Sequence, residues 1–314
     1  MIDLLLKIHQ FFFGLNDKNT YKGKNFFMWV ITNLFARIFE ILLFVWLKCK
    51  NILNLYSDCN GEVNNQLVVS FTTYPARIDN VWMVVDSIVR QTMRPFVIEL
   101  WLSEENFPQK ELELPLTLMK YKLRGFLDIK WVKEDLKPHK KYFYSFLQHK
   151  DKFVVTIDDD LYYRRDMIAL LWKIYEKFPN SVCGHRGGIV VPYEKYEKWS
   201  ISNYALAPSH KNYVTGCGGV LYPVSMFKNN FIFDQNLIKE NSLQTDDLWL
   251  KAMELIDDIP VTIGDYYCNA PTLPNSKKSA LMNMNCNPLH SGNDTNWECL
   301  DKLFHVNDLV AKKR

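Results

Sequence analysis

Several features that would assign a protein to a familiar class are missing from this chain of 314 residues. Its seven cysteines are an odd, scattered number without a C-x-x-C pair, which argues against a zinc ribbon or a disulfide framework and favours a reducing compartment. Internal repeats and low-complexity tracts are also absent, so solenoids and disordered scaffolds are excluded. Neither G-x-G-x-x-G nor GxxxxGK[ST] occurs, which excludes the dinucleotide-binding and P-loop motifs.

A large charge of either sign is absent as well. Lys plus Arg number 38 and Asp plus Glu number 35, and the resulting net charge of +3 excludes a polybasic nucleic-acid binder. Residues 1–60 carry seven basic and four acidic side chains, an excess equal to the net charge of the whole chain. The apolar content of 48% is ample for a sizeable core in one or two domains.

One long apolar run, FFMWVITNLFARIFEILLFVWL, covers residues 26–47 and is long enough at 22 residues to cross a bilayer. Arg37 and Glu40 interrupt it and disfavour a true span, and no small-residue cleavage site follows it, which argues against a signal peptide. On a helix its polar residues form one narrow stripe, with lysines on both flanks. Two interpretations remain: a helix packed on the main domain with this stripe facing water, or a helix in a membrane interface with its lysines at the headgroups.

From about residue 61 onward, strand-like and helix-like segments alternate. Apolar β runs occupy 67–71, 96–102, 127–132 and 153–157, and helical spacing occurs at 81–91, 140–148, 166–178 and 248–256. This alternation predicts an α/β fold with a mixed, mainly parallel sheet, flanking helices and a ligand site at the carboxyl ends of the strands. We therefore expect an N-terminal helical, membrane-associating segment over 1–60 and one catalytic domain over 61–314.

Three consecutive carboxylates, Asp158, Asp159 and Asp160, directly follow an apolar strand. Side chains two apart on an extended chain point the same way, so Asp158 and Asp160 can converge on one point. Three adjacent carboxylates repel one another unless a cation is present, which favours a site for Mn²⁺ or Mg²⁺ completed by water and substrate phosphate oxygens. The alternative is helix capping, because acidic side chains favour the positive end of the helix that follows.

A second acidic pair, Asp246 and Asp247, follows Thr245 at the predicted start of a helix. A threonine cap with two acidic residues in the first turn is ordinary helix chemistry. The functional alternative makes one of the two a general base beside the substrate. Spacing alone leaves both interpretations open.

Five short blocks along the chain carry a resemblance to a known family. They are VVSFTTYPARI, SIVRQTMRPFVIELWLSEENFP, FVVTIDDDLYY, TGCGGVLYP and TDDLWLKAM, and the similarity that they mark runs from about Leu67 to about Asp265. In this order they resemble bacterial glycosyltransferases of the GT-A fold, similar to glycosyltransferase family 2. The resemblance implies a Rossmann-like sheet and a metal-dependent enzyme that moves a sugar from a nucleotide-sugar donor to a hydroxyl of a glycan or lipid-linked acceptor.

The resemblance also implies roles for individual residues. Asp158–Asp160 is similar to the DXD motif, in which Asp160 would bind the metal directly and Asp158 would contact the ribose or share the metal. Asp247 matches the catalytic base, but Asp246 stands where the family has Glu, which leaves open which of the two acts. His290, in a late H-x-G pattern, would be a further metal ligand or else a turn residue. The other positions implied to line the donor site are Thr72, Thr73, Arg77, Lys140 or Lys141, Asp159, Gly218 and Gly219.

These implications predict an inverting transferase of bacterial surface polysaccharide synthesis, for capsule or lipopolysaccharide, at the cytoplasmic face of the inner membrane. Inversion depends on the Asp247 match alone. Two alternatives remain: a membrane-tethered, non-catalytic scaffold that binds glycan or nucleotide, and a nucleotidyltransferase. The second would need a glycine-rich basic loop after the first strand, which this chain lacks. No nucleic-acid partner is expected.

Overall fold

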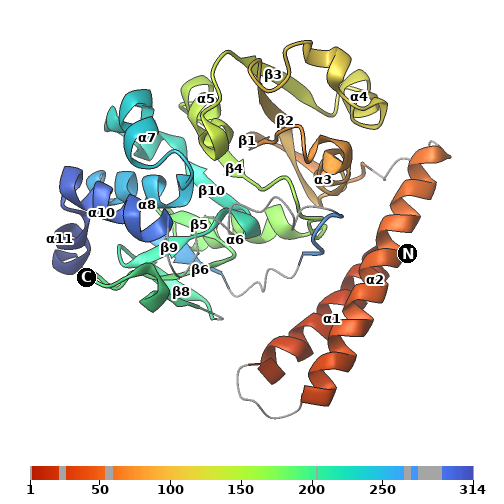
Figure 1. Cartoon of the computed structure of the whole chain (residues 1–314), viewed down its shortest axis with the longest axis horizontal. Coiled ribbons are helices and arrows are strands. Elements are labelled where there is room, and N and C mark those ends of the chain that lie inside the picture. Colours follow the sequence, from red (N-terminus) through yellow and green to blue (C-terminus); the bar gives the residue numbers. More distant parts are fainter. Residues whose placement is uncertain are drawn as a thin grey trace.

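The protein consists of an α/β body and an N-terminal pair of helices (Figure 1). The computed structural model describes residues 2–20, 26–53, 59–202, 204–264, 270–274 and 292–313, without the side chains of 13–20 and 26–29.

An eight-stranded sheet in the order β3-β2-β1-β4-β10-β5-β11-β8 forms the centre of the body. Strands β10 and β8 run antiparallel to their neighbours, and the other six run in one direction. The predicted mixed, mainly parallel α/β sheet is therefore confirmed. Its strands are β1 (Glu62–Thr72), β2 (Met93–Ser103), β3 (Asp128–Val132), β4 (Phe153–Thr156), β5 (Val182–Gly184), β8 (Leu206–Ser209), β10 (Val220–Pro223) and β11 (Val261–Ile263).

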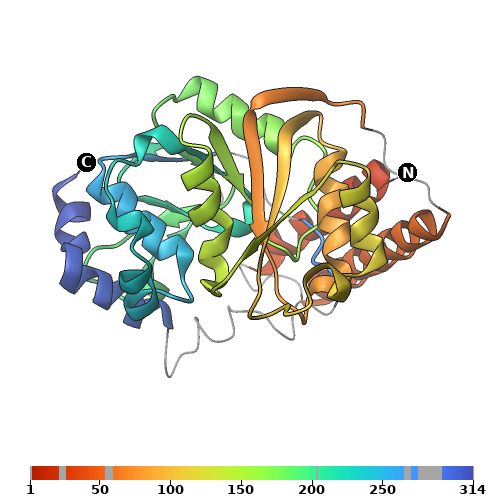
Figure 2. The ribbon, with the colours of Figure 1, turned by 90° about the horizontal axis from the view of Figure 1, so that it is seen from above.

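Helices cover both faces of this sheet (Figure 2), which explains why the strands are continuous apolar runs. On one face, Val69 and Phe71 of β1 pack with α3 (Val81–Val89), α4 (Leu116–Leu123) and α6 (Met167–Lys177). On the other face, Val68 packs with the other helices that the structure describes in the body. These are α5 (Lys140–Gln148), α7 (Gln235–Asn241), α8 (Asp246–Ile256), α10 (Gly292–Phe304) and α11 (Val306–Lys312).

A small three-stranded sheet, β7-β6-β9, lies beside the main sheet on the side of β8 and β11. Its strands are β7 (Ser200–Ile201), β6 (Gly187–Ile189) and β9 (Asn212–Val214). The sequence patterns did not predict this sheet, because strands of two or three residues are too short to show a period.

The N-terminal helices α1 (Ile2–Thr20) and α2 (Phe26–Ile52) lie side by side and extend away from the body (Figure 1). The segment α1 was not predicted separately from the sequence. Glu40 of α2 is buried and pairs with His9 of α1 at 3.3 Å and with Arg37. In one of the two interpretations of the sequence the polar stripe of α2 faces water, whereas in the structure its Glu40 faces α1.

One end of this helix pair is attached to the body. Asp3 of α1 forms an ion pair with Arg90, and the Arg90 guanidinium also donates to the Tyr162 hydroxyl at 3.3 Å. Apolar side chains at the same end join the core of the body, and they are Ile2, Leu6, Leu43, Phe44 and Leu47. The helix pair is thus part of the packed core at one end and extends outward at the other.

Candidate functional site

Three chain segments meet at one edge of the main sheet. Strands β1 and β4 are parallel neighbours, with Ser70 opposite Thr156, so the segments that follow them leave the sheet side by side. Strand β10 is antiparallel to β4, with Val220 opposite Thr156, so the glycine-rich segment before it reaches the same edge. The first turn of α8 joins them, because Asp247 accepts a hydrogen bond from the Gly216 amide at 3.2 Å. The structure thus brings the two acidic motifs of the sequence together.

The three consecutive carboxylates alternate in direction. The side chains of Asp158 and Asp160 are 30% and 22% exposed, whereas that of Asp159 is 8% exposed. Asp158 and Asp160 therefore face solvent, as the extended-chain argument predicts. Helix α6 begins only at Met167, with Asp166 as its N-cap residue, so the helix-capping interpretation of the three carboxylates is wrong.

The inward carboxylate ties the loop after β1 to the loop after β4. Thr73 donates its hydroxyl to Asp159 at 2.6 Å, and the Arg77 guanidinium lies 2.5 Å from Asp159 and 3.2 Å from Asp160. The guanidinium also lies over the Tyr74 ring, 5.5 Å from its centroid. Charge-assisted hydrogen bonds of this kind fix the conformation of both loops.

Two adjacent lysines at the start of α5 have different partners. The Lys141 ammonium lies 3.0 Å from a carboxylate oxygen of Asp158 and 2.9 Å from one of Asp246. Lys140 is also buried, but it pairs with Asp135, away from these carboxylates. Of the two lysines that the sequence left open, the structure places Lys141 in the site.

The acidic pair at the start of α8 is not a simple helix cap. The Thr245 side chain makes no capping hydrogen bond, and instead contacts the Ser242 hydroxyl and accepts from Asn296, both at 2.8 Å. Asp246 is buried against Lys141, whereas Asp247 is partly exposed at the strand edge. The two acids therefore have different surroundings, and Asp247 is the more accessible one.

Burial and repulsion from neighbouring carboxylates change the pKa of Asp160. Burial raises the pKa of Asp160 to about 7, and the charges of Asp158 and Asp159 add to this shift while Arg77 opposes it. A bound cation would relieve the same repulsion. A raised pKa caused in part by neighbouring carboxylates is expected where those carboxylates share a cation.

The same effects act on the second acidic pair. Burial raises the pKa of Asp247 well above its ordinary value, with Asp246 adding to the shift and Lys141 opposing it. Burial lowers the pKa of Lys141, but the charges of Asp158, Asp246 and Asp247 outweigh burial, and the pKa is raised overall. Lys141 therefore stays protonated, and the pKa of Asp247 is shifted upward, as is common for carboxylates at functional sites.

The residues present fit a divalent cation in part. Asp158 and Asp160 supply two carboxylates, and the described part of the chain contains no group of three or more His, Cys, Asp or Glu placed to hold a metal. Hard cations with few protein ligands complete their shell with water and substrate phosphate oxygens, so two carboxylates suit Mn²⁺ or Mg²⁺ bound together with a phosphate-bearing substrate. His290 lies outside the described residues, and its role as a ligand stays a prediction.

The other residues that the sequence implied lie around this edge. Thr72 turns toward β2, where its hydroxyl donates to the Trp101 carbonyl at 2.7 Å. Gly218 packs against the loop after β5, since a Cβ there would lie 3.1 Å from its nearest neighbours. Gly219 has φ +81°, a left-handed conformation that favours glycine. Neither Gly218 nor Gly219 has an acidic residue among its nearest neighbours.

Two residues that the sequence did not single out complete the site. A Cβ on Gly216 would lie 2.8 Å from both the Asp158 carboxylate and the Lys141 ammonium, so this position has no room for a side chain. The Tyr163 hydroxyl accepts a hydrogen bond from the Asp158 amide at 2.9 Å. Gly216 belongs to the same TGCGGVLYP block as Gly218 and Gly219 and could have been found there, whereas nothing in the sequence marks Tyr163.

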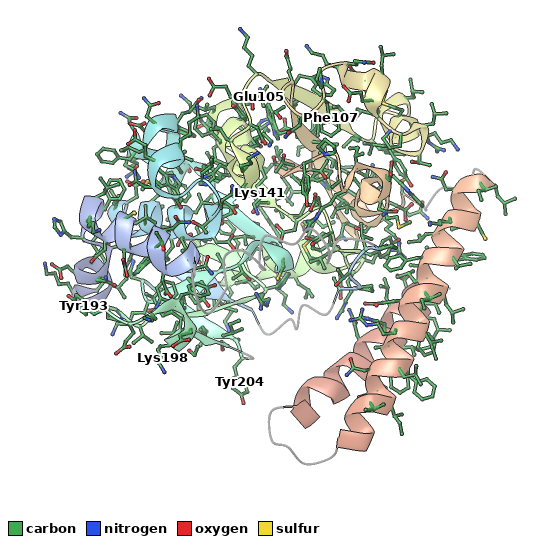
Figure 3. The ribbon with its side chains drawn as sticks, in the orientation of Figure 1. Glu105, Phe107, Lys141, Tyr193, Lys198 and Tyr204 are labelled. Atoms are coloured by element: carbon green, nitrogen blue, oxygen red, sulfur yellow. The ribbon has the colours of Figure 1, made fainter. Side chains whose placement is uncertain are left out.

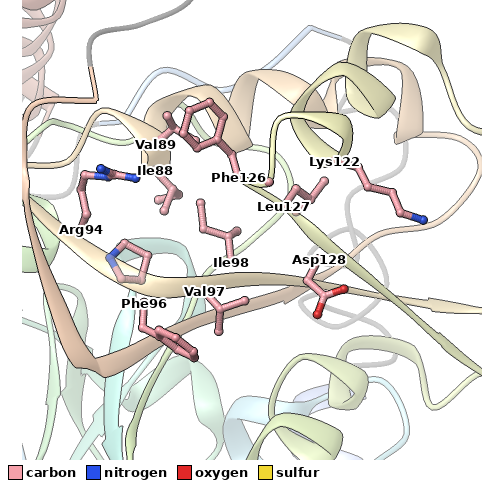
Figure 4. Close-up of a pocket in the computed structure, with 12 residues that line it drawn as sticks. Ile88, Val89, Arg94, Phe96, Val97, Ile98, Lys122, Phe126, Leu127 and Asp128 are labelled. Atoms are coloured by element: carbon pink, nitrogen blue, oxygen red, sulfur yellow. The ribbon is translucent and has the colours of Figure 1, made fainter.

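A separate cavity of about 350 Å³ lies at the opposite edge of the sheet, at the amino ends of β2 and β3 (Figure 4). Apolar side chains such as Phe96, Ile98 and Phe126 line it, and Arg94 and Lys122 lie at its margin. It contains none of the acidic residues described above, so it is not part of the candidate site.

No family model and no curated protein matches the chain. Among solved structures, S. aureus TarS 1–349 in complex with UDP is 15% identical over 66% of this chain and 59% of that chain, with a TM-score of 0.43. The chain therefore spans less than two thirds of that TarS structure. A 4-diphosphocytidyl-2C-methyl-D-erythritol synthase is 8% identical, and the match covers 70% of the present chain and 99% of the synthase, with a TM-score of 0.41. UTP-bound UGPase from Acinetobacter baumannii is 11% identical, and the match covers 74% of the present chain and 96% of the UGPase, with a TM-score of 0.39. Similarities at this level assign neither a family nor an activity to the chain.

Proposed function

We propose that the protein is a metal-dependent glycosyltransferase that moves a sugar from a nucleotide-sugar donor to a hydroxyl group of a glycan or lipid-linked acceptor. The observation that carries this proposal is the meeting of two acidic groups at one strand edge, where Asp247 bonds the Gly216 amide and Gly216 packs against Asp158. The carboxylates after β4 suit a cation and a diphosphate, and the acidic pair at the start of α8 suits removal of a proton from a hydroxyl.

The reaction follows from this division of labour. Mn²⁺ or Mg²⁺ held by Asp158 and Asp160 would supply Lewis-acid stabilisation of the charge on the diphosphate. Asp247 accepts the proton of the acceptor hydroxyl, whose oxygen forms a bond to the anomeric carbon. The bond from that carbon to the diphosphate oxygen breaks, and its electron pair leaves with the nucleoside diphosphate. A single displacement of this kind inverts the anomeric configuration. Arg77 and Thr73 keep Asp159 inward, which aims its two neighbours at the donor.

We further propose that the helix pair α1–α2 holds the body at the cytoplasmic face of a bacterial inner membrane, where lipid-linked precursors of capsule or lipopolysaccharide are used. Residues Val30–Ile52 form a helix long and apolar enough to cross a membrane. Only 33% of its apolar 18-residue stretch is buried inside the protein, whereas the core helix of a soluble protein is mostly buried. Leu34, Ile38 and Ile41 are exposed on α2. Leu43 and Phe44 of the same helix belong to the core of the body, so one end of this helix is packed against the body.

Transfer assays with a panel of nucleotide sugars test the catalytic proposal. We expect release of nucleoside diphosphate that requires Mn²⁺ or Mg²⁺, stops with EDTA, and is lost in Asp247→Asn while donor binding persists. Donor binding without any release or transfer would instead identify a binding scaffold. Formation of pyrophosphate from a nucleoside triphosphate and a sugar phosphate would identify a nucleotidyltransferase.

A further inference from the structure

The two acidic groups of the site are connected by one buried side chain, the ammonium group of Lys141. The Lys141 ammonium lies 3.0 Å from Asp158 after β4 and 2.9 Å from Asp246 at the start of α8. These two carboxylates come from elements far apart in the sequence, and Lys141 contributes the positive charge between them. Their relative position therefore depends on a side chain that belongs to neither element.

Lys141 is not open to a ligand. Its side chain is only 6% exposed, and its ammonium is paired with Asp158, whose side chain is 30% exposed. Gly216 closes another side, because a Cβ there would lie 2.8 Å from the ammonium. The Lys141 carbonyl accepts a hydrogen bond from the Ser70 hydroxyl at 2.5 Å, which fixes the residue to β1. Lys141 is buried, and it lies near the middle of the body in the view of Figure 3.

We propose that Lys141 is a positioning residue, which sets the spacing between Asp158 and the first turn of α8 and holds Asp246 away from the acceptor. Proton transfer is thereby assigned to Asp247, a choice that the sequence left open. The proposal rests on the proposed function, because it concerns the geometry of the same site. It differs from the sequence expectation, in which a lysine at this position meets the donor or its diphosphate.

The two roles of Lys141 differ in their kinetic signature. A lysine that binds the diphosphate contributes to donor affinity, so its loss raises the donor KM. A lysine that spaces the two acidic groups affects the alignment of the reacting atoms, so its loss lowers kcat, and a misplacement of about 1 Å can lower the rate about 100-fold. Donor affinity then changes little, because no donor contact is removed.

The experiment compares Lys141→Met, Asp246→Asn and the double variant with the wild-type full chain. We expect each single variant to lower kcat about 100-fold. Donor KM should stay within about threefold. The double variant should lose little more than either single variant, because both remove the same bridge.

A matched control is Lys251→Met. Lys251 is also a buried lysine in an ion pair, 3.3 Å from Glu254, but it lies within α8 beyond the first turn and outside the site. Its replacement should leave kcat within about threefold of wild type, so that a loss in Lys141→Met cannot come from removal of a buried lysine alone. If Lys141→Met does not fold, the isosteric Asp246→Asn tests the same bridge from its other end.

Three results would overturn the inference. A raised donor KM at unchanged kcat in Lys141→Met would mean that the lysine binds the donor. Wild-type kcat in Asp246→Asn, or additive losses in the double variant, would mean that the ion pair does not position the site. In each case an active wild-type chain leaves the proposed function standing. A wild-type chain that neither binds nor transfers any nucleotide sugar overturns the proposed function and this inference together.

Discussion

The exposed apolar face of α2 predicts how strongly the protein binds a membrane. The variant that tests it replaces Leu34, Ile38 and Ile41 by serine, three side chains that are 58%, 40% and 62% exposed. Full burial of one such side chain is worth about 2 kcal/mol, so burial of these exposed parts in lipid contributes about 3 kcal/mol in total. That free energy corresponds to a loss of membrane affinity of about 100-fold.

The assay is cosedimentation of the full chain with vesicles of phosphatidylethanolamine and phosphatidylglycerol. The matched control replaces three apolar residues of similar exposure on the body, Leu147, Ile201 and Leu303, by serine. The control should bind vesicles like the wild type, and both variants should keep the thermal unfolding midpoint within a few degrees, since surface changes have small effects on stability.

Two results would refute this reasoning. Unchanged vesicle binding in the α2 variant would mean that this face does not contact lipid. A wild-type chain that fails to bind vesicles, and that forms a dimer which the α2 variant dissociates in sedimentation equilibrium, would mean that a second copy of the chain covers the face instead.

Three further predictions concern the site and its support. Asp247→Asn should lower kcat at least about 1,000-fold, with donor affinity by calorimetry nearly unchanged, and retention of full activity would exclude Asp247 as the base. Arg77→Met should lower the free energy of unfolding by about 3 kcal/mol, because it leaves the buried Asp159 carboxylate without its ion pair; an unchanged urea midpoint would contradict this. Burial opposes ionisation of Asp135, but Lys140, Lys137 and Asn106 outweigh it and bring the pKa of Asp135 to about 2. A carboxylate with a lowered pKa stabilises the fold above pH 4 and loses this effect as the pH falls toward 2, so Asp135→Asn should cost about 2 kcal/mol at pH 7 and progressively less below pH 4 in urea titrations.

The central strands could be predicted from the sequence because a covered sheet demands apolar residues on both faces. The runs 96–102 and 153–157 correspond to β2 (Met93–Ser103) and β4 (Phe153–Thr156). The place of β10 could not be predicted, because its antiparallel pairing with β4 joins residues more than sixty positions apart and leaves no local pattern. Helix α1 could not be predicted as a separate element for a related reason. It packs against α2, and this packing between two helices leaves no signal within the α1 segment itself.

Some residues of the candidate site could be predicted from the sequence, and others could not. The acidic residues could be predicted, because three carboxylates after a strand are costly without a partner and so stand out. The choice between Lys140 and Lys141 could not be, because neighbours on a helix point about 100° apart and only the packing of α5 on the sheet decides which one faces the edge. The same holds for Gly216, whose role depends on its distance to Asp158 and Lys141.

The attachment of α1 to the body has a practical consequence for anyone who wishes to prepare a water-soluble form of this protein. Removing residues 1–60 would take Asp3 from Arg90, which also contacts Tyr162, two positions after Asp160. It would also uncover the apolar surface that Leu43, Phe44 and Leu47 now shield. Polar substitutions on the outward face of α2 are the gentler route, because they change the solubility of the protein and leave the support beneath its acidic loop in place.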